Sequence, residues 1–475
     1  MLVLTVGTSP RLIRDLWSRI GTRGGYRFSH LVHPGVARHS VAQDLDPESL
    51  HFFREELSDP LPAPDPQLLA SLEKGPVPTI HNMIMSDRFV SGVDYSEGLA
   101  YATLLTRRLL AVYAATRPTL VIGGFDGLHG ALGFAVARLV SIPWFTLYFS
   151  GLPYEQACFC STLSPASRVP LDRRGAGELR REAESLLGDF EARRAQSALY
   201  VPPKLLSPSF ILRQVPTQLT SLRRVLHRRK QQRYLKYTDY RSSYSIGGMV
   251  HEAFRLRKNL YQLRRQRLLS CPIEGRYAFF GLHMQPESSI DVFAHFFSNQ
   301  LRVVELMSRS LPPTHALLVK LHKSDALNYP RERLAQLANF PGVKLVSPYA
   351  DSREFVDKAD LIFSIQGTMG FESAMLGKPV IMFGDSPVKI FPSVATIGRT
   401  IDLPELVRAK LAEAPPARDS IVTALMAYLR PLHPASGNDW NVRPTDEQID
   451  AYVKLFAMLQ DYVQGEAVNR AAESR

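Results

Sequence analysis

The sequence predicts an α/β fold in two parts, each with a mainly parallel β-sheet. A chain of 475 residues exceeds what one hydrophobic core usually covers, so two domains are expected. Short apolar strands alternate with helical patterns in residues 1–148 and again in residues 276–383, which is typical of doubly wound parallel sheets. The predicted segments are an N-terminal α/β domain at 1–200, a basic, mainly helical connector at 201–271, a C-terminal α/β domain at 272–410 and a helical tail at 411–475.

The clearest site pattern lies in residues 359–384. Apolar residues 361–363 predict a strand buried on both faces, and residues 371–376 fit a short helix before a second strand at 380–383. Free backbone N–H groups at the amino end of such a helix suit a phosphate. The turn that would supply them contains Gly367, Thr368 and Gly370, and Glu372 lies on the first turn of the helix.

This pattern resembles a known family motif. The series Ser364-x-x-Gly367-Thr368-x-Gly370-x-Glu372, followed by Gly377-Lys378-Pro379-Val380, is similar to the nucleotide-sugar motif in the C-terminal domain of GT-B glycosyltransferases. The resemblance implies two Rossmann-like domains, last helices that cross back to the N-terminal domain, a loop that takes the donor diphosphate, and a Glu that holds the ribose hydroxyls. Epimerases that act on UDP-N-acetylglucosamine share this fold and a similar motif. The alternative is an ordinary turn between strand and helix in any α/β protein.

A second resemblance covers roughly residues 275–390. A predicted strand at 277–282 ends in His283-Met-Gln285-Pro286-Glu287, which is similar to the "LHxQPE" segment of bacterial capsule and surface-polysaccharide glycosyltransferases. In that family the next strand usually ends in Lys-x-His-Pro. This chain has Lys320-Leu-His322-Lys323, so it departs from the family at the last position.

A sugar-nucleotide donor carries a diphosphate leaving group, and cations and N–H donors stabilise the charge that develops there. No metal or cofactor is then required. The predicted substrate-binding residues are His283, Gln285, Glu287, Lys320, His322, Lys323, Gln366, Gly367, Thr368, Gly370, Glu372 and Ser373. Glu287 could instead be an acidic residue at a helix amino end, and His322 a strand-end histidine bonded to a neighbouring loop.

The acceptor hydroxyl needs a general base if the stereochemistry inverts. A predicted strand at 119–123 is followed by a loop with Asp126 and His129, at the strand end where ligands of parallel sheets gather. Asp126 is therefore the first candidate for the catalytic base and His129 the second. A turn aspartate and a helix-cap histidine are the competing interpretations.

An aromatic series follows the His283 segment. Helical spacing predicts a long helix from Ser289 to about Ser310, with Phe293, Phe296 and Phe297 on one face. We expect this stripe to lie in the core and to have no cofactor role.

The net charge of +12 comes from one segment, residues 223–267, which holds 14 Lys or Arg and two acidic residues. The rest of the chain has 43 basic and 43 acidic residues. A solvated helical hairpin between the domains explains this composition, and so does a face that lies on an anionic membrane or a lipid-linked acceptor. Nothing in the segment resembles a nucleic-acid-binding module, so no nucleic-acid partner is expected.

No apolar run reaches 18 residues, the start lacks a basic leader, and the three cysteines fit neither a disulfide framework nor a zinc site. We therefore expect a cytoplasmic protein, with peripheral attachment to the inner face of the cytoplasmic membrane as the alternative. The leading functional hypothesis is transfer of a sugar from a nucleotide-sugar to a surface or capsular polysaccharide or its lipid-linked precursor. The alternatives are a sugar-nucleotide 2-epimerase and a non-catalytic polysaccharide-assembly protein at the membrane surface.

Overall fold

The computed structural model describes residues 1–41, 45–171, 174–192, 236–238, 254–255, 257–259, 261–263, 265–323, 325, 329–435 and 443–473. The chain divides into two compact units. Unit 1 comprises Met1–Arg174, Arg228–Ser243 and Arg430–Arg475, and unit 2 comprises Gly175–His227 and Tyr244–Leu429. Most of the basic segment 223–267 lies outside the described residues. Of its second predicted helix, residues 254–255, 257–259 and 261–263 are described, and they are helical.

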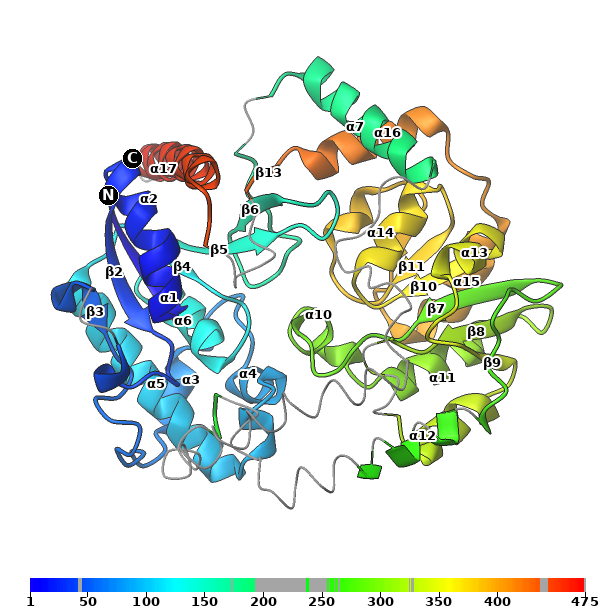
Figure 1. The fold of residues 1–475 in the computed structure, drawn as a ribbon, viewed down its shortest axis with the longest axis horizontal. Helices are drawn as coiled ribbons and strands as arrows, with labels where there is room; N and C mark the ends of the chain where they lie inside the picture. Colours follow the sequence, from blue (N-terminus) through cyan, green and yellow to red (C-terminus); the bar gives the residue numbers. More distant parts are fainter. Residues whose placement is uncertain are drawn as a thin grey trace. The chain divides into compact units, whose positions relative to one another are not determined.

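Unit 1 is built on a seven-stranded sheet with the order β13-β6-β5-β4-β1-β2-β3 (Figure 1). Strands β3, β2, β1, β4 and β5 run parallel, while β6 and β13 are antiparallel to their neighbours. The elements are β1 (Leu2–Thr8), α1 (Pro10–Leu12), a π-helical turn (Ile13–Trp17), α2 (Ser18–Gly24), β2 (Arg27–Val32), β3 (Leu50–His51), α3 (Pro66–Ser71), α4 (Ile80–Ser86), α5 (Tyr95–Thr116), β4 (Leu120–Gly123), α6 (Leu128–Leu139), β5 (Trp144–Phe149), β6 (Gln156–Cys160), β13 (His433–Pro434) and α17 (Asp446–Glu473).

Unit 2 is built on a six-stranded, fully parallel sheet with the order β12-β11-β10-β7-β8-β9. The elements are α7 (Ala176–Glu191), β7 (Tyr277–Gly281), α10 (Ser288–Asp291), α11 (Gln300–Ser310), β8 (Ala316–Lys320), α12 (Arg331–Asn339), β9 (Val343–Val346), α13 (Ser352–Lys358), β10 (Leu361–Ser364), α14 (Thr368–Met375), β11 (Val380–Met382), β12 (Val394–Thr396), α15 (Leu403–Ala412) and α16 (Arg418–Leu429).

Both sheets are covered on both faces. In β10, Leu361 and Phe363 join the core on one face and Ile362 joins the core on the other. In β4, Val121 and Ile122 divide between two cores in the same way. Side chains that alternate between two apolar layers explain why these strands read as continuous apolar runs. The predicted fold class, α/β with two Rossmann-like domains, is confirmed by these sheets.

The C-terminal helix α17 packs on unit 1 beside α2 (Figure 1). Its Phe456 ring contacts Trp17, Tyr26, Phe28 and Phe159, with centroids 5.3–6.1 Å apart. After the last part of unit 2, the chain therefore returns to unit 1 at residue 430.

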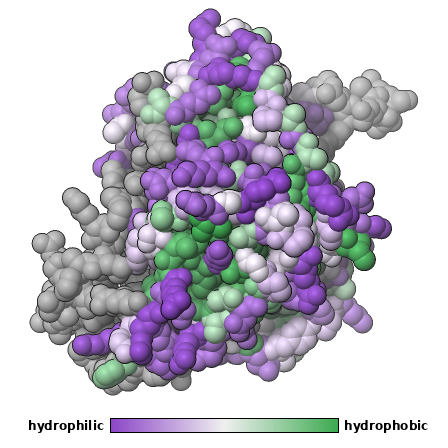
Figure 2. All heavy atoms as spheres, turned by 90° about the vertical axis from the view of Figure 1, so that its right-hand side faces the viewer, coloured by the Kyte–Doolittle hydropathy of each residue, from purple (hydrophilic) through white to green (hydrophobic). Residues whose placement is uncertain are grey.

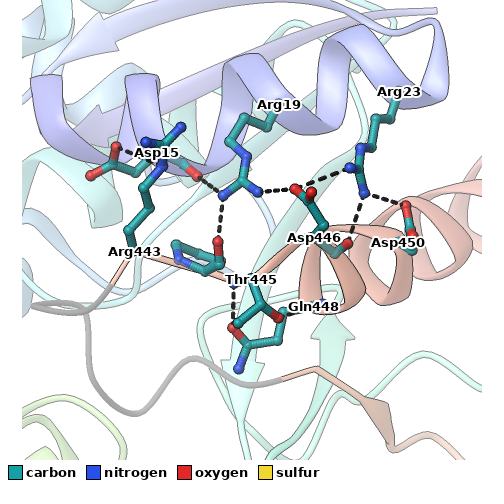
Figure 3. A network of polar contacts seen from close by, with 9 residues as sticks. Asp15, Arg19, Arg23, Arg443, Thr445, Asp446, Gln448 and Asp450 are labelled. Atoms are coloured by element: carbon teal, nitrogen blue, oxygen red, sulfur yellow. Dashed lines mark hydrogen bonds and ion pairs between the residues drawn. The ribbon is translucent and has the colours of Figure 1, made fainter.

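Polar contacts fix the start of α17 against α2 (Figure 3). Arg19 donates to the carbonyl of Pro444 and to Asp446, each at 2.5 Å. Arg23 donates to the carbonyl of Asp446 at 2.8 Å and to Asp450 at 2.7 Å. These contacts set the position of the helix, while the apolar face below them supplies most of the stabilisation, since exposed ion pairs contribute little.

Helix α7 belongs to unit 2, whereas the sequence grouped residues 1–200 in one domain. It lies beside α16 (Figure 1), with ion pairs from Arg180 to Asp419 and from Arg418 to Glu191. The sequence of α7 by itself did not indicate which unit would receive its apolar face, formed by Leu179, Ala183 and Leu187.

The predicted long helix from Ser289 to about Ser310 is wrong. The chain forms α10, a separate 3-10 turn at His295–Phe297, and then α11. Asn299 starts α11 by accepting a hydrogen bond from the N–H of Arg302 at 3.2 Å. The expectation that the aromatic stripe lies in the core also fails at Phe296, whose residue surface is 87% exposed.

The face drawn in Figure 2 carries hydrophilic residues (purple) around a smaller area of hydrophobic ones (green). Single exposed apolar side chains are ordinary on protein surfaces. An exposed apolar side chain therefore indicates a binding role only where its position also suggests one, for example at the edge of a parallel sheet where ligands bind.

We expect Phe456→Ala to destabilise unit 1 by about 3–5 kcal/mol, because it leaves a cavity among four aromatic rings. Chemical denaturation followed by far-ultraviolet circular dichroism measures this. Lys454→Ala, an exposed change on the same helix, is the control and should stay within about 0.5 kcal/mol of wild type. Equal stability of the two variants would mean that α17 does not contribute to the core of unit 1.

Candidate functional site

The carboxyl ends of the central strands of unit 2 form the candidate site. Strand β7 lies between β10 and β8, so the residues that follow these three strands are neighbours. The strand order also reverses its direction of growth at β7 and β10, and ligands of parallel sheets bind at such a point. The groups brought together there are His283 after β7, Lys320 and His322 at the end of β8, and the Gly367 turn after β10.

The Gly367 turn requires glycine. Its φ is +94°, in the left-handed region, and a Cβ placed on it would lie 3.2 Å from Cε1 of His283. The Gln366 N–H points to Nε2 of His283 at 3.5 Å, and the Gln366 side chain donates to the carbonyl of Asp385. Gly367 itself is exposed, so the turn is accessible at the edge of the sheet.

Helix α14 begins directly at this turn, with Gly367 as its N-cap residue. Gly370 allows close packing, because a Cβ there would lie 2.7 Å from Sδ of Met382. Ser373 is fully buried, and its hydroxyl has no hydrogen-bond partner among the described residues. The structure therefore places Ser373 behind the turn, away from the accessible edge, although the sequence grouped it with the binding residues.

Two oppositely charged groups lie beside the turn. Burial lowers the pKa of Lys320 to about 8, and its Nζ donates to the Ser352 hydroxyl at 2.8 Å. Burial raises the pKa of Glu372 to about 7, opposed by Arg353, Lys320 and a hydrogen bond from Thr368. Lys320 and Glu372 influence each other's pKa, so they lie in one electrostatic environment. Glu372 is partly buried and lies five residues after the exposed Gly367.

The two histidines of the site are held neutral. Burial lowers the pKa of His283 to about 4, and the neighbouring His322 adds to this. Burial also lowers the pKa of His322, and the charge of Lys320 is the second cause of this lowering. Nδ1 of His322 is buried without a hydrogen-bond partner among the described residues. Lys323 lies in the same loop, and burial lowers its pKa as well.

Gln285 supports the loop that follows β7. Its amide donates to Asp291 at 3.0 Å and to the carbonyl of Ser298 at 2.9 Å, and it accepts from Gln300 at 3.1 Å. Glu287 immediately precedes α10, and its N–H donates to Asp291. The described contacts of Gln285 are thus within the protein, and they give it a positioning role. Gln300 and Ser352 take part in the site but carried no sequence signal.

The corresponding edge of unit 1 holds Asp126 and His129. Nη2 of Arg88 donates to both carboxylate oxygens of Asp126, at 2.7 and 2.6 Å, and the Asp126 side chain is 48% exposed. Asp87, next to Arg88, is buried and accepts the N–H of Leu128 at 2.6 Å, which fixes the start of α6. The sequence pattern gave Arg88 and Asp87 no role.

His129 packs on the turn after β1. A Cβ on Gly7, whose φ is +76°, would lie 2.3 Å from Nε2 of His129. The His129 ring lies 5.0 Å from the ring of His33 and 6.4 Å from that of Phe53, between centroids. Burial, and then His33, lowers the pKa of His129 to about 3, so its imidazole is neutral at physiological pH.

The edge of unit 2 thus offers N–H groups, a partly buried cation and a carboxyl group of raised pKa, which together can bind a phosphorylated, hydroxylated ligand. Among the described residues, no group of three or more His, Cys, Asp or Glu is placed to hold a metal ion. No helix in the described part of the chain has the length and apolarity to cross a membrane.

Replacement of Glu372 tests whether burial raises the pKa of this carboxyl group and so destabilises its charged form. Between its ordinary pKa of 4.5 and its folded value of about 7, the unfolded chain releases a proton that the folded protein keeps, so this group lowers stability as pH rises through that range. Glu372→Gln removes the titration. We expect the melting temperature of the variant to rise relative to wild type from about pH 5 to about pH 7 and to stay higher above it.

Calorimetry of both proteins across this pH range measures the effect. Glu354→Gln, an exposed change on the neighbouring helix α13, is the matched control and should follow the wild-type profile. A difference between Glu372→Gln and wild type that does not vary with pH would contradict the raised pKa.

No known protein family matches the sequence, and no curated protein matches it. The chain is similar in structure to a KpsC beta Kdo 2,4 transferase of Thermosulfurimonas dismutans, with 12% identity, a TM-score of 0.39, and coverage of 91% of this chain and 92% of the other. It is also similar to a UDP-GlcNAc 2-epimerase of Neisseria meningitidis bound to UDP-GlcNAc, with 12% identity, a TM-score of 0.27, and coverage of 90% and 99%. Both kinds of enzyme that the sequence motifs resemble are thus among these structures. At such identities and TM-scores, neither similarity decides the ligand or the reaction of this chain.

Proposed function

We propose that the chain is a glycosyltransferase that uses a nucleotide-sugar donor, bound at the carboxyl edge of the unit 2 sheet. The observation that carries this proposal is the position of the Gly367 turn beside His283, with Lys320 and Glu372 in one electrostatic environment next to it. Backbone N–H groups and a cation suit a diphosphate, and a carboxyl group suits the hydroxyls of a ribose.

The proposed roles follow from the charge that develops when the glycosidic bond breaks. The leaving diphosphate gains negative charge, and the N–H groups of Thr368 and its neighbours would stabilise it together with Lys320. Glu372 would accept hydrogen bonds from the ribose hydroxyls. Neutral His283 and His322 would line the diphosphate without adding charge. In this scheme the protein's own groups neutralise the leaving group.

We further propose that unit 1 binds the acceptor, a surface or capsular polysaccharide or its lipid-linked precursor. Asp126 is the proposed base for the acceptor hydroxyl, and Arg88 holds its carboxylate in place. His129 is the second candidate. Its neutral imidazole can accept a proton, but a pKa of about 3 makes it the weaker base.

The basic segment 223–267 supports a second partner, an anionic membrane surface. Among its described residues, Phe254 and Tyr261 are 70% and 60% exposed, and Lys258 and Arg265 are exposed beside them. Exposed aromatic and basic side chains together suit the interface of an anionic lipid layer. Such attachment would bring the enzyme to a lipid-linked acceptor.

The same donor site would also serve a sugar-nucleotide 2-epimerase. Incubation with donor alone separates the two reactions, because an epimerase converts the free nucleotide-sugar whereas a transferase requires an acceptor. A chain that binds no nucleotide-sugar at all would instead be a non-catalytic assembly protein.

A panel of UDP-, GDP- and CMP-sugars tests the donor site. A donor that binds the folded state raises the melting temperature of the protein, so at least one nucleotide-sugar of the panel should raise it. Lys320→Ala should weaken binding of that donor roughly tenfold to hundredfold, because it removes a charged hydrogen-bond donor. Binding by wild type should also weaken as pH rises past about 8, where Lys320 loses its proton.

Isothermal titration at several pH values measures both effects. Lys344→Ala, an exposed lysine on β9 of the same sheet, is the control and should bind as wild type does. Unchanged donor affinity in Lys320→Ala would refute the proposed role of Lys320. Failure of every nucleotide-sugar in the panel to bind would refute the donor site.

Asp126→Asn tests the base. Loss of a general base should lower the transfer rate roughly a hundredfold or more, while donor affinity stays unchanged because Asp126 belongs to the other unit. Single-turnover transfer and donor titration measure the two quantities. Asp450→Asn, which alters an exposed ion pair on α17, is the matched control and should retain the wild-type rate. Full transfer activity in Asp126→Asn would exclude this residue as the base and leave His129→Gln as the next variant.

A further inference from the structure

Phe296 is the most exposed large hydrophobic residue in the described part of the chain, at 87%. Its neighbours behave differently. Ala294, just before the 3-10 turn, is buried, and the partly buried Phe297 ring packs on Phe383 with centroids 5.3 Å apart. The chain thus covers part of the residues on either side and turns one aromatic ring outward.

The turn that presents Phe296 is held at several points. His295 Nδ1 contacts the carbonyl of Val292 at 3.0 Å, and the Gln285 amide donates to the carbonyl of Ser298 at 2.9 Å. The Phe296 ring also lies 4.3 Å from the ring of His295, between centroids. The conformation that exposes the Phe296 ring is therefore fixed by hydrogen bonds of the turn. Exposure of a large apolar ring to water costs free energy unless the ring packs against a ligand or partner.

The position of this turn points to the donor site. A Cβ placed on Gly384 would lie 2.8 Å from Cβ of Ala294 and 3.0 Å from Cγ of Gln366. Gly384 follows β11, and Gln366 begins the Gly367 turn after β10. The turn with Phe296 therefore belongs to the same carboxyl edge as the proposed diphosphate site.

The strand order separates the two sides of that site. Lys320 ends β8 and Ser352 follows β9, on one side of the β10–β7 pair, while Gly384 and Ala294 lie on the β11 side. The proposed function places the ribose at Glu372 in α14, and Met369 of that helix packs on the face of the sheet that holds Ile362. Ala294 and Phe297 pack on the opposite face, with Phe363. A diphosphate at the Gly367 turn, where β10 ends between these faces, then directs the other end of the donor, its sugar, toward the turn with Phe296.

We propose that Phe296 is the platform on which the donor sugar ring stacks, and that Gln285 positions it by holding the loop. This inference rests on the proposed function. One face of a pyranose presents mainly C–H bonds, and an aromatic ring offers such a face a large apolar surface with little entropy to lose. Residue 296 would then discriminate among donors by the sugar, while the Gly367 turn and Glu372 bind the nucleoside diphosphate.

Paired ligands test this directly. Titration of wild type and Phe296→Ala with UDP-N-acetylglucosamine and UDP, and with GDP-mannose and GDP, separates the sugar from the rest of the donor. For the pair that binds, Phe296→Ala should weaken the nucleotide-sugar about tenfold and leave the nucleoside diphosphate unchanged. Phe296→Trp, which keeps an aromatic surface, should restore most of the lost affinity.

Phe254→Ala is the matched control, because it removes another exposed phenylalanine of unit 2, from the basic segment, and should bind both ligands as wild type does. Equal weakening of nucleotide-sugar and nucleoside diphosphate in Phe296→Ala, or no weakening of either, would overturn the inference while leaving the donor site in place. Failure of wild type to bind any member of the pairs would refute the proposed use of these donors, and the role of Phe296 with it.

Discussion

The pairing of β7 with β10 is the constraint on which the rest of unit 2 depends. The two strands run parallel, with Leu361 opposite Ala278 and Phe363 opposite Phe280, so both end at the same edge. Gly281 completes the arrangement, because a Cβ there would lie 2.3 Å from Cε of Met369 in α14. A larger residue would force the Met369 side chain out of its place against the strand end. The closeness of His283 and the Gly367 turn thus follows from a buried backbone pairing.

Around this pairing the protein buries charge at some cost. The pKa of Lys320 is lowered and that of Glu372 is raised, and in both cases burial is the largest cause. Each group therefore destabilises the folded protein in its charged form, and their mutual attraction offsets only part of this. Groups kept in such surroundings are typical of functional sites, where a ligand completes the set of charges.

Unit 1 arranges its five parallel strands in a similar order but presents different chemistry. Its edge presents an ion-paired carboxylate, Asp126, and a neutral imidazole, His129, which rests on the Gly7 turn. Unit 2 instead presents backbone N–H groups and a partly buried lysine, Lys320. Two sheets of similar topology therefore support different proposed partners, because the loops at the strand ends carry the chemistry while the sheets carry the fold.

The sequence by itself determined the two parallel sheets and the strand ends at which polar residues gather, since apolar runs and glycine turns are local signals. It pointed to the Gly367 turn and Glu372 for the same reason. Only the tertiary structure decided that α7 joins unit 2, that Arg88 pairs with Asp126, and that Gln285 holds a loop. Some of these contacts join residues far apart in the chain, and the others depend on the conformation of a loop. Phe296 shows the difference most clearly. Helical spacing placed it in the core, but caps and side-chain hydrogen bonds broke the helix and turned its ring outward.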